Sequence, residues 1–435
     1  MRAAWRAGAG RLARLCGPGW RSINGALAPR SPGSALKPFA YLLALESGFT
    51  AASVLPDLPR EYATPTGLYE PRNYSGQFYY LIPLREALGN SLNVSAVHLL
   101  NQIGGAEPFA EALQRAGLTT LTEEPEHYGL GLVIGNAEVR LLELANAYAC
   151  LARLGAWKPY RLDRAGADPP PTQIFDRDAA WLVADILADN AARARAFSAW
   201  SALRMGFPVA CKTGTSTDFR DSWAFGYTPE FTAGVWIGNF DGTPMQDVAS
   251  IRGPAPVLRE VIGELRARFG TGWFERPAGI RRAAVDPVLG LRVPADHPRA
   301  AGEWFLPGTE PRLAKTEDDD DPNGRPLLPY EYRRWLAGTD NWLGASAIAR
   351  TEPDHAAPLE IRNPLPGTVI FLDPDLPGSG SAFPLEANRA VRWASDTLEI
   401  NGDLATVKPG RHAITATDAQ TGEVSETWIE VRGAR

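Results

Sequence analysis

The sequence has few cysteines, few histidines and no long apolar run, and each shortage excludes a class of protein. Its three cysteines cannot close into pairs and no CxxC occurs, which excludes a disulfide-stapled fold and a zinc knuckle. The five histidines are scattered and no HExxH is present, so we expect no metal site. Because no stretch of about 18 apolar residues exists, no membrane-spanning helix is predicted.

Lysine is scarce as well. Only five of the 44 basic residues are lysine: Lys37, Lys158, Lys212, Lys315 and Lys408. Arginine cannot lose its proton in a protein, whereas lysine can when its pKa is depressed. Each lysine is therefore worth testing for a role in proton transfer.

The overall composition is that of a soluble globular protein, with 45% hydrophobic and 22% charged residues. The net charge is −6, which gives no basic surface for nucleic acid. At 435 residues the chain is long enough for two or three domains.

Four segments are predicted along the chain. Residues 1–30 carry six arginines and no acid but lack the apolar core of a secretion signal, and we interpret them as a basic N-terminal remnant. Residues 31–275 form a mixed α/β (α+β) block. Residues 276–355, rich in proline, glycine and charge, are expected to be a linker in which the acidic run 317–321 is a solvated loop. Residues 356–435 show short β-rich pieces separated by turns, which indicates a small all-β sandwich of the immunoglobulin type.

Periodicity places the main elements of the block. A helix over 35–46 is predicted, with Ser34 as its N-cap. Further helices are predicted over 84–88, 94–103, 109–116, 139–154 and 177–189. Three short strands, 208–216, 222–227 and 231–240, are expected to form an antiparallel meander.

The first chemical motif is Ser34-Ala35-Leu36-Lys37. Residues i and i+3 share one face of a helix, so the hydroxyl and the amine are expected to lie one turn apart. Serine is a poor nucleophile without an adjacent base, and lysine serves as one only when it is neutral. Alone, the motif is equally typical of a capped helix with a surface lysine.

The second motif is Ser91-Leu92-Asn93, which offers a hydroxyl to relay a proton and an amide to hold a substrate amide. It is also weak alone: Ser22-Ile23-Asn24 has the same pattern but precedes Ser34.

The third motif is Lys212-Thr213-Gly214-Thr215, on the first strand of the meander. Lys212 is expected to attract a substrate carboxylate and to lower the pKa of Lys37. Gly214 is expected to leave room for a substrate backbone beside the strand. The alternative is a strand-end lysine before a polar turn.

The three motifs occur in the chain order S-x-x-K, S-x-N, K-T-G, a set found in penicillin-binding proteins and class A β-lactamases. Longer stretches resemble class A penicillin-binding proteins, most closely the 1C type. They include RSPGSALKPFAYLLALE, EALGNSLNVSAV and CKTGTSTDFRDSWAFGYTPEFTAGVWIGNFDG. The resemblance covers roughly residues 20–435. It implies a penicillin-binding/serine β-lactamase-like transpeptidase domain, with an antiparallel sheet and a helical subdomain, followed by the β-sandwich.

The resemblance implies a peptidoglycan D,D-transpeptidase that cross-links stem peptides. Ser34 would attack the D-Ala-D-Ala carbonyl, Lys37 would act as base, and Ser91 would relay the proton to the leaving amine. Lys212 completes the catalytic set.

The resemblance also implies the substrate contacts. Asn93 would orient the peptide amide, while Thr213 and Thr215, together with Lys212, would bind the terminal carboxylate beside Gly214. The backbone N–H groups of Ser34 and Thr215 would form the oxyanion hole.

The implied partners are the stem peptide ending in D-Ala-D-Ala, β-lactam antibiotics, and other cell-wall synthesis proteins through the terminal β-domain. No nucleic acid, metal or organic cofactor is implied. The implied location is the periplasmic face of the inner membrane, although the sequence shows no signal peptide or membrane span.

Class A members also carry an anchor and a glycosyltransferase domain, which have no counterpart in this sequence, so we expect no glycosyltransferase activity. The family places two further strands beside the last strand of the meander, and without them 231–240 is expected to be an exposed sheet edge. Two alternatives therefore stay open. One is a truncated, non-catalytic fragment or binding module of a bifunctional enzyme. The other is a β-lactamase-like serine hydrolase, for which no sequence signal positions the helping glutamate.

Overall fold

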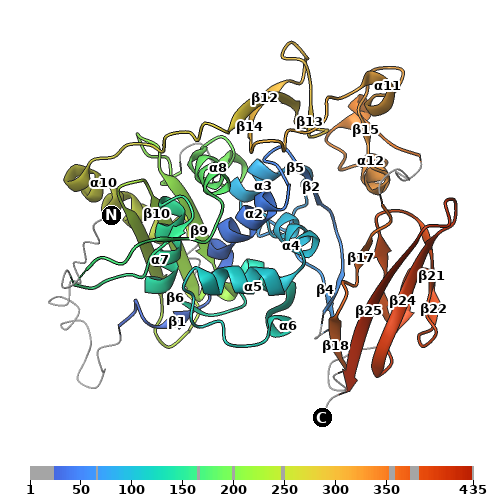
Figure 1. Ribbon diagram of the computed structural model, residues 1–435, viewed down its shortest axis with the longest axis horizontal. Helices are drawn as coiled ribbons and strands as arrows, with labels where there is room; N and C mark the ends of the chain where they lie inside the picture. Colours follow the sequence, from blue (N-terminus) through green and yellow to red (C-terminus); the bar gives the residue numbers. More distant parts are fainter. Residues whose placement is uncertain are drawn as a thin grey trace.

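The structure of the protein is a computed structural model that describes residues 24–64, 67–163, 167–197, 201–245, 250–351, 358–372 and 382–433. Cys16, the decoy residues Ser22 and Ile23, and most of the basic segment 1–30 lie outside these ranges. Figure 1 shows a central α/β block, a middle segment beside it, and a terminal all-β part at one end.

A three-stranded antiparallel sheet organises the α/β block, and it confirms the predicted meander. Its strands are β9 (Ala210–Thr215), β10 (Asp221–Tyr227) and β11 (Thr232–Gly238), in the order β11-β10-β9. Successive side chains alternate between the two faces. Trp223 and Phe225 therefore enter the main core, whereas Ala224 and Cys211 belong to a second core with the helix α10 (Pro254–Phe269).

The helices lie close to their predicted positions. They are α2 (Lys37–Glu46), α3 (Leu84–Gly89), α4 (Asn93–Gln102), α5 (Ala106–Arg115), α6 (Pro125–Tyr128), α7 (Leu141–Ala152), α8 (Arg177–Ala188) and α9 (Ala194–Phe197). Helix α2 is apolar on nearly every side and is accordingly buried on nearly every side, at the centre of the block. Over the described ranges, no helix combines the length and apolar character needed to cross a membrane.

The start of α2 differs from the prediction. Ser34 is not an N-cap, because it lies inside a 3₁₀ helix, Gly33–Leu36, and no cap hydrogen bond forms. The α-helix begins at Lys37 because Pro38, which has no N–H to donate, suits the first turn of a helix. The predicted helix 139–154 is also shorter, since β6 (Val139–Arg140) pairs with β1 (Pro29–Arg30) before α7 begins.

Three further strand pairs and two 3₁₀ helices complete the block. The antiparallel pairs are β2 (Val54–Asp57) with β5 (Tyr80–Pro83), β3 (Tyr62–Thr64) with β4 (Gly67–Tyr69), and β7 (Ala156–Trp157) with β8 (Thr172–Gln173). The 3₁₀ helices are Gly129–Ile134 and Thr217–Phe219.

Strand β11 has a hydrogen-bonded partner on one side only among the described residues, as the sequence predicts. Its exposure is nevertheless incomplete. The Arg30 guanidinium lies 5.5 Å from the centre of the Trp236 ring, and Trp236 Nε1 donates to Asp221 Oδ1 at 2.8 Å. The segment before α2 therefore covers part of this edge.

The middle segment is folded and not an extended linker. It contains a three-stranded sheet and several short elements: β12 (Arg281–Asp286), β13 (Leu291–Arg292), β14 (Ala301–Phe305), α11 (Thr316–Asp319), β15 (Leu327–Leu328), the 3₁₀ helix Tyr330–Tyr332, α12 (Arg333–Leu336), the 3₁₀ helix Gly344–Ser346 and β16 (Ile348–Ala349). It packs on the α/β block where Trp335 stacks on Tyr80, with ring centroids 4.8 Å apart.

The prediction of a solvated acidic loop at 317–321 is wrong for two of its residues. Asp319 and Asp321 are buried, and each accepts hydrogen bonds from an arginine: Arg312 at 2.6 Å and Arg325 at 2.7 Å. The sequence pattern indicated a loop because periodicity cannot show that these aspartates will meet arginines from nearby parts of the chain.

The terminal domain, residues 358–433, is all-β as predicted. Its sheets have the orders β18-β25-β24-β21 and β19-β23-β22, with the pair β17-β20 beside them. The strands are β17 (Ile361–Asn363), β18 (Thr368–Leu372), β19 (Ala382–Pro384), β20 (Glu386–Ala387), β21 (Val391–Ala394), β22 (Ile400–Asn401), β23 (Leu404–Thr406), β24 (Gly410–Asp418) and β25 (Val424–Gly433). A separate apolar core, which includes Ile414 and Ile429, fills this domain.

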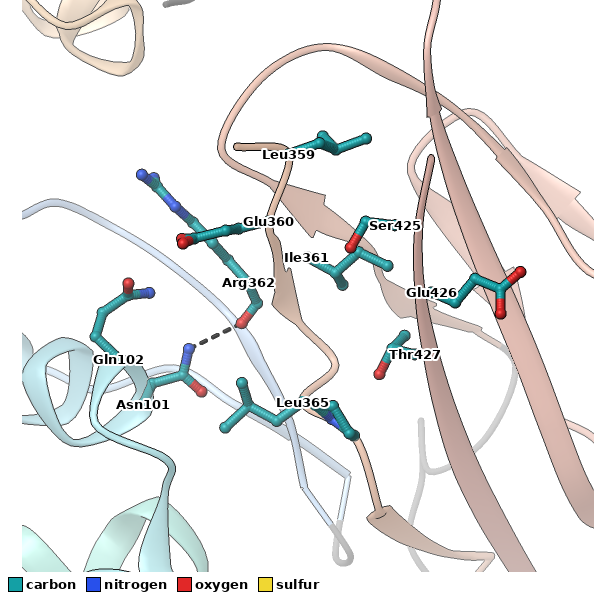
Figure 2. A pocket seen from close by; sticks show the side chains of 11 residues that line it. Asn101, Gln102, Leu359, Glu360, Ile361, Arg362, Leu365, Ser425, Glu426 and Thr427 are labelled. Carbon is teal, nitrogen blue, oxygen red and sulfur yellow. Dashed lines mark hydrogen bonds between the residues drawn. The ribbon is translucent and has the colours of Figure 1, made fainter. Parts of the chain in front are cut away.

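Charged and polar contacts join the terminal domain to the block. Arg60, near the end of β2, pairs with Glu331 at 2.8 Å and with Glu386 of the terminal domain at 2.9 Å. At the C-terminal end of α4, Asn101 Nδ2 donates to the backbone oxygen of Arg362 at 2.8 Å (Figure 2). A cavity of about 300 Å³ lies at this junction, and none of the three motifs contributes to its lining.

The separate core predicts that Ile414→Ala will destabilise the terminal domain selectively. Ile414 is fully buried, so its truncation should lower the free energy of unfolding by about 2–5 kcal/mol. Chemical denaturation followed by tryptophan fluorescence measures this change. Val424→Ala is the matched control because Val424 is 53% exposed on β25, and an equal loss in both variants would contradict the assignment.

Candidate active site

The turn that carries Ser34 is pressed directly against strand β9. A Cβ placed on Gly214 would lie 2.2 Å from the carbonyl oxygen of Pro32, and one placed on Gly33 would lie 2.3 Å from that of Thr215. Gly33 also has a φ of +53°, a conformation that glycine adopts without strain. Gly214 was expected to make room for a substrate. The structure shows that it makes room for the Ser34 turn of the protein itself.

Side chains from the core fix the same turn from other directions. Tyr148 Oη donates to Ala35 O at 2.7 Å, and Trp223 Nε1 donates to Ser31 O at 2.7 Å. The Ser31 hydroxyl in turn donates to Gly135 O at 2.6 Å. The position of Ser34 is thus set by contacts on both sides of the turn.

Lys37 is fully buried, and its amine points toward the second motif. Its Nζ donates to Ser91 O at 2.7 Å, to Leu92 O at 2.9 Å and to Asn93 Oδ1 at 2.7 Å. Burial lowers the pKa of Lys37 well below its usual 10.5, the nearby Lys212 lowers it further, and Asp57 opposes the shift. The amine is therefore electrostatically prepared to lose its proton.

Ser34 and Lys37 lie in consecutive turns, since the Lys37 backbone N–H donates to Ser34 O. Within the described ranges, no hydrogen bond joins the Ser34 hydroxyl to Lys37 Nζ. Catalytic hydrogen bonds are often long before substrate binds, so this arrangement agrees with a base that has still to engage its nucleophile.

Lys212 approaches the second motif from β9. Its Nζ donates to Ser91 Oγ at 2.7 Å and to Thr213 O at 2.8 Å. Burial lowers the pKa of Lys212 to about 7, and the neighbouring Arg193 contributes to the shift. Two buried lysines thus flank Ser91, one at its carbonyl and one at its hydroxyl.

The second motif occupies the turn that leads into α4. Ser91 has a φ of +60°, which is rare for a residue with a side chain and holds its hydroxyl toward Lys212. Asn93 is the first residue of α4, and its Nδ2 donates to Arg72 O at 2.9 Å. One hydrogen of the Asn93 side-chain amide is therefore already used in a hydrogen bond within the protein.

The two threonines of the third motif are placed differently from its lysine. In the regular alternation of β9, Thr213 and Thr215 lie on the face opposite Lys212. Thr213 is buried, whereas Thr215 is partly exposed, and its Oγ1 accepts a long hydrogen bond of 3.4 Å from Ser250 N. The structure therefore brings together Lys37, Ser91, Asn93 and Lys212, and leaves the two threonines beside them.

Sequence reasoning missed three residues that shape this site. They are Asp57 and Asn73, which lie beneath the second motif, and Arg193, which acts on Lys212. None belongs to a short motif, and each reaches the site through the tertiary fold. An isolated acid at the end of an apolar strand was the available signal for Asp57.

Comparison with known proteins shows the family of this chain. Residues 22–262, more than half of the chain, match the family described as the penicillin binding protein transpeptidase domain. The chain belongs to the penicillin-binding protein transpeptidase family. Penicillin-binding protein 1C of Escherichia coli K12 is 31% identical over 416 residues, which cover 93% of this chain and 51% of that protein. Penicillin-binding protein 1A of Pseudomonas aeruginosa is 27% identical over 343 residues, 64% of this chain and 41% of that protein. The chain thus spans about half of the length of the first relative and less of the second.

Solved penicillin-binding proteins share the fold. Penicillin-binding protein 1A from Haemophilus influenzae superposes with a TM-score of 0.56 at 22% identity, covering 66% of this chain and 50% of that one. PonA1 from Mycobacterium tuberculosis, in complex with penicillin V, gives a TM-score of 0.50 at 25% identity and covers 59% of this chain and 74% of that one.

The glycine contact predicts the effect of Gly214→Ala. The added Cβ must displace the Ser34 turn, so we expect the free energy of unfolding to fall by about 1–3 kcal/mol. Gly206→Ala is the matched control, since a Cβ there meets no atom within 4 Å. Thermal denaturation of both variants measures the difference, and equal stability would contradict the contact.

Proposed function

We propose that the chain is a serine-type D,D-transpeptidase of peptidoglycan synthesis, acting on stem peptides that end in D-Ala-D-Ala. The observation that carries this proposal is the meeting of two buried lysines of lowered pKa around Ser91, next to the turn that presents Ser34. Family membership supports the reaction class, and the geometry supports the role that we propose for each group.

In the proposed first step, the Ser34 hydroxyl attacks the carbonyl carbon of the penultimate D-Ala while its proton passes to neutral Lys37. Backbone N–H groups of Ser34 and Thr215 stabilise the oxyanion that forms. The proton then reaches the leaving amine through Ser91, the C–N bond breaks, and D-Ala departs.

In the proposed second step, an amine from a neighbouring stem peptide attacks the Ser34 ester. A new peptide bond forms, and Ser34 regains its hydroxyl group.

Substrate recognition is proposed along the free edge of β9, which has no hydrogen-bonded neighbour on that side among the described residues. An extended peptide adds readily to such an edge through main-chain hydrogen bonds. Protonated Lys212 attracts the terminal carboxylate, with Thr213 and Thr215 as further partners, and Asn93 holds the peptide amide. A β-lactam would occupy the same place and acylate Ser34. We place this reaction on the periplasmic face of the inner membrane, by analogy with the family.

The proposal predicts that a fluorescent penicillin labels the chain at Ser34. Ser34→Ala should abolish the covalent adduct, because the substitution removes the hydroxyl that is proposed to attack. Mass spectrometry of the labelled peptide locates the adduct, and Ser47→Ala, an exposed serine at the end of α2, is the control. Fast turnover of nitrocefin would favour a β-lactamase-like hydrolase instead, and a folded chain without an adduct would favour a non-catalytic binding module.

The two lysines predict a bell-shaped pH dependence of the second-order acylation constant, which reports on the free enzyme. The constant should rise as Lys37 loses its proton and fall above about pH 7 as Lys212 loses its own. In Lys212→Arg the falling limb should move to higher pH, because arginine keeps its charge. Lys315→Arg, at an exposed site, should reproduce the parent profile. A parent constant that keeps rising well above pH 7 would contradict the role of Lys212.

A further inference from the structure

Asp57 is a buried carboxylate whose hydrogen-bond partners are all donors. It ends β2 with no exposed surface, and its Oδ2 accepts from Asn73 Nδ2 and from Tyr79 N, both at 2.7 Å. Its Oδ1 accepts from Ser95 Oγ of α4 at 3.0 Å. A carboxylate with this many donors is held in one orientation, and no arginine or lysine is paired with it among the ion pairs of the described residues.

Asn73 connects this carboxylate to the second motif. Its Nδ2 donates to Asp57 and to Gln77 O, so its Oδ1 must face the other way. That oxygen accepts from Asn93 N at 2.8 Å and from Val94 N at 3.2 Å.

The first N–H groups of a helix have no partner within the helix. In α4 the residue at the cap position, Leu92, has no side chain that can accept a hydrogen bond. Asn73, from a separate loop, therefore supplies the cap that α4 lacks. The neighbouring Arg72 carbonyl also holds Asn93 Nδ2, so a single loop fixes both the backbone and the amide of Asn93.

We propose that Asp57 and Asn73 are positioning residues of this active site: Asp57 orients Asn73, and Asn73 caps α4 and so fixes Ser91 and Asn93 against Lys37. The proposal rests on the proposed function for its catalytic meaning. Neither residue touches the reacting atoms: Asn73 acts through the start of α4, and Asp57 acts through Asn73 and through its charge.

Asp57 is also linked to Lys37 by a chain of hydrogen bonds, which runs from Lys37 Nζ through Asn93 and Asn73 to the Asp57 carboxylate. We therefore expect its charge to act on Lys37 as well.

The charged groups that act on Lys37 are Lys212 from β9 and Asp57 from β2. Arg193 acts in turn on Lys212, and Asp57 also acts on the buried Tyr41 of α2. Asp57 is the negative charge that raises the pKa of Lys37 against the effects of burial and of Lys212. It therefore limits how far the proton affinity of the base falls.

The first arm of the experiment measures the pKa of Lys37 directly. With only five lysines in the chain, ¹³C-labelled lysine side chains give a short NMR spectrum, and Lys37→Arg identifies the signal. In Asp57→Asn the pKa of Lys37 should fall below that of the parent, because the nearby negative charge is gone.

A substitution that merely loosened the site would admit water and raise this pKa toward 10.5, so the direction of the shift separates the two cases. Asp286→Asn is the matched control. Asp286 is also a fully buried carboxylate, bonded to Arg299 at 2.6 Å in the middle segment, and its loss should leave the pKa of Lys37 unchanged. An unchanged or raised pKa of Lys37 in Asp57→Asn overturns the electrostatic role.

The second arm uses Asn73→Ala. Amide hydrogen exchange at Asn93 and Val94 should accelerate, because these N–H groups lose their acceptor. The acylation rate constant of bound penicillin should fall by about 10- to 100-fold while its dissociation constant changes little, since the catalytic groups are misplaced by a fraction of an ångström. Ser75→Ala, in the same loop, is the control.

Asn73→Asp tests the same link by partial rescue. When the introduced carboxyl group is protonated, it keeps one oxygen for α4 and donates its proton to Asp57, so the acylation rate relative to that of the parent at the same pH should recover at low pH. Acylation should then decline as the two neighbouring carboxyl groups ionise and repel each other. Unchanged amide exchange and acylation in Asn73→Ala overturn the positioning role. If the parent chain forms no penicillin adduct, the proposed function fails, whereas the NMR and exchange results still decide this inference.

Discussion

The close backbone contact between the Ser34 turn and strand β9 is the constraint on which the rest of the site depends. Gly33 and Gly214 permit it, because any side chain at either position would collide with the opposite backbone. With the turn so placed, Lys37 enters the core at the start of α2, and Lys212 reaches the same region from β9. Burial lowers the pKa of both amines; Lys212 lowers that of Lys37 further, and Arg193 lowers that of Lys212. The acid–base properties of the site therefore depend on the packing that buries both lysines.

Much of the architecture could be predicted from the sequence because it is written in local patterns. The meander follows from short runs rich in aromatic and β-branched residues between tight turns, α4 and α8 from helical spacing, and the all-β terminal domain from short strands between turns. The order of the three motifs likewise predicts which residues meet. Lys37, Ser91, Asn93 and Lys212 do lie together, although 175 residues separate the first from the last (212 − 37).

The parts that the sequence did not reveal depend on long-range contacts. The 3₁₀ geometry around Ser34 follows from the contact with β9, which local propensity cannot show. The cap of α4 comes from Asn73, twenty residues upstream, so a search for a capping residue next to the helix fails. The middle segment looked like a linker because its elements are short, and because they are held by arginine–carboxylate pairs and by small apolar clusters, neither of which gives a long periodic pattern.

Helix α4 joins the candidate active site to the terminal domain. Its first residue, Asn93, belongs to the candidate active site, and Asn101, in its last turn, is bonded to the backbone of the terminal domain. A helix of ten residues is about 15 Å long and bends little over that distance. A tilt of the terminal domain that moved Asn101 would therefore also reorient the N-terminal end of α4, where Asn93 lies. A force applied to the terminal domain at Asn101 would in this way reach Asn93 in the candidate active site.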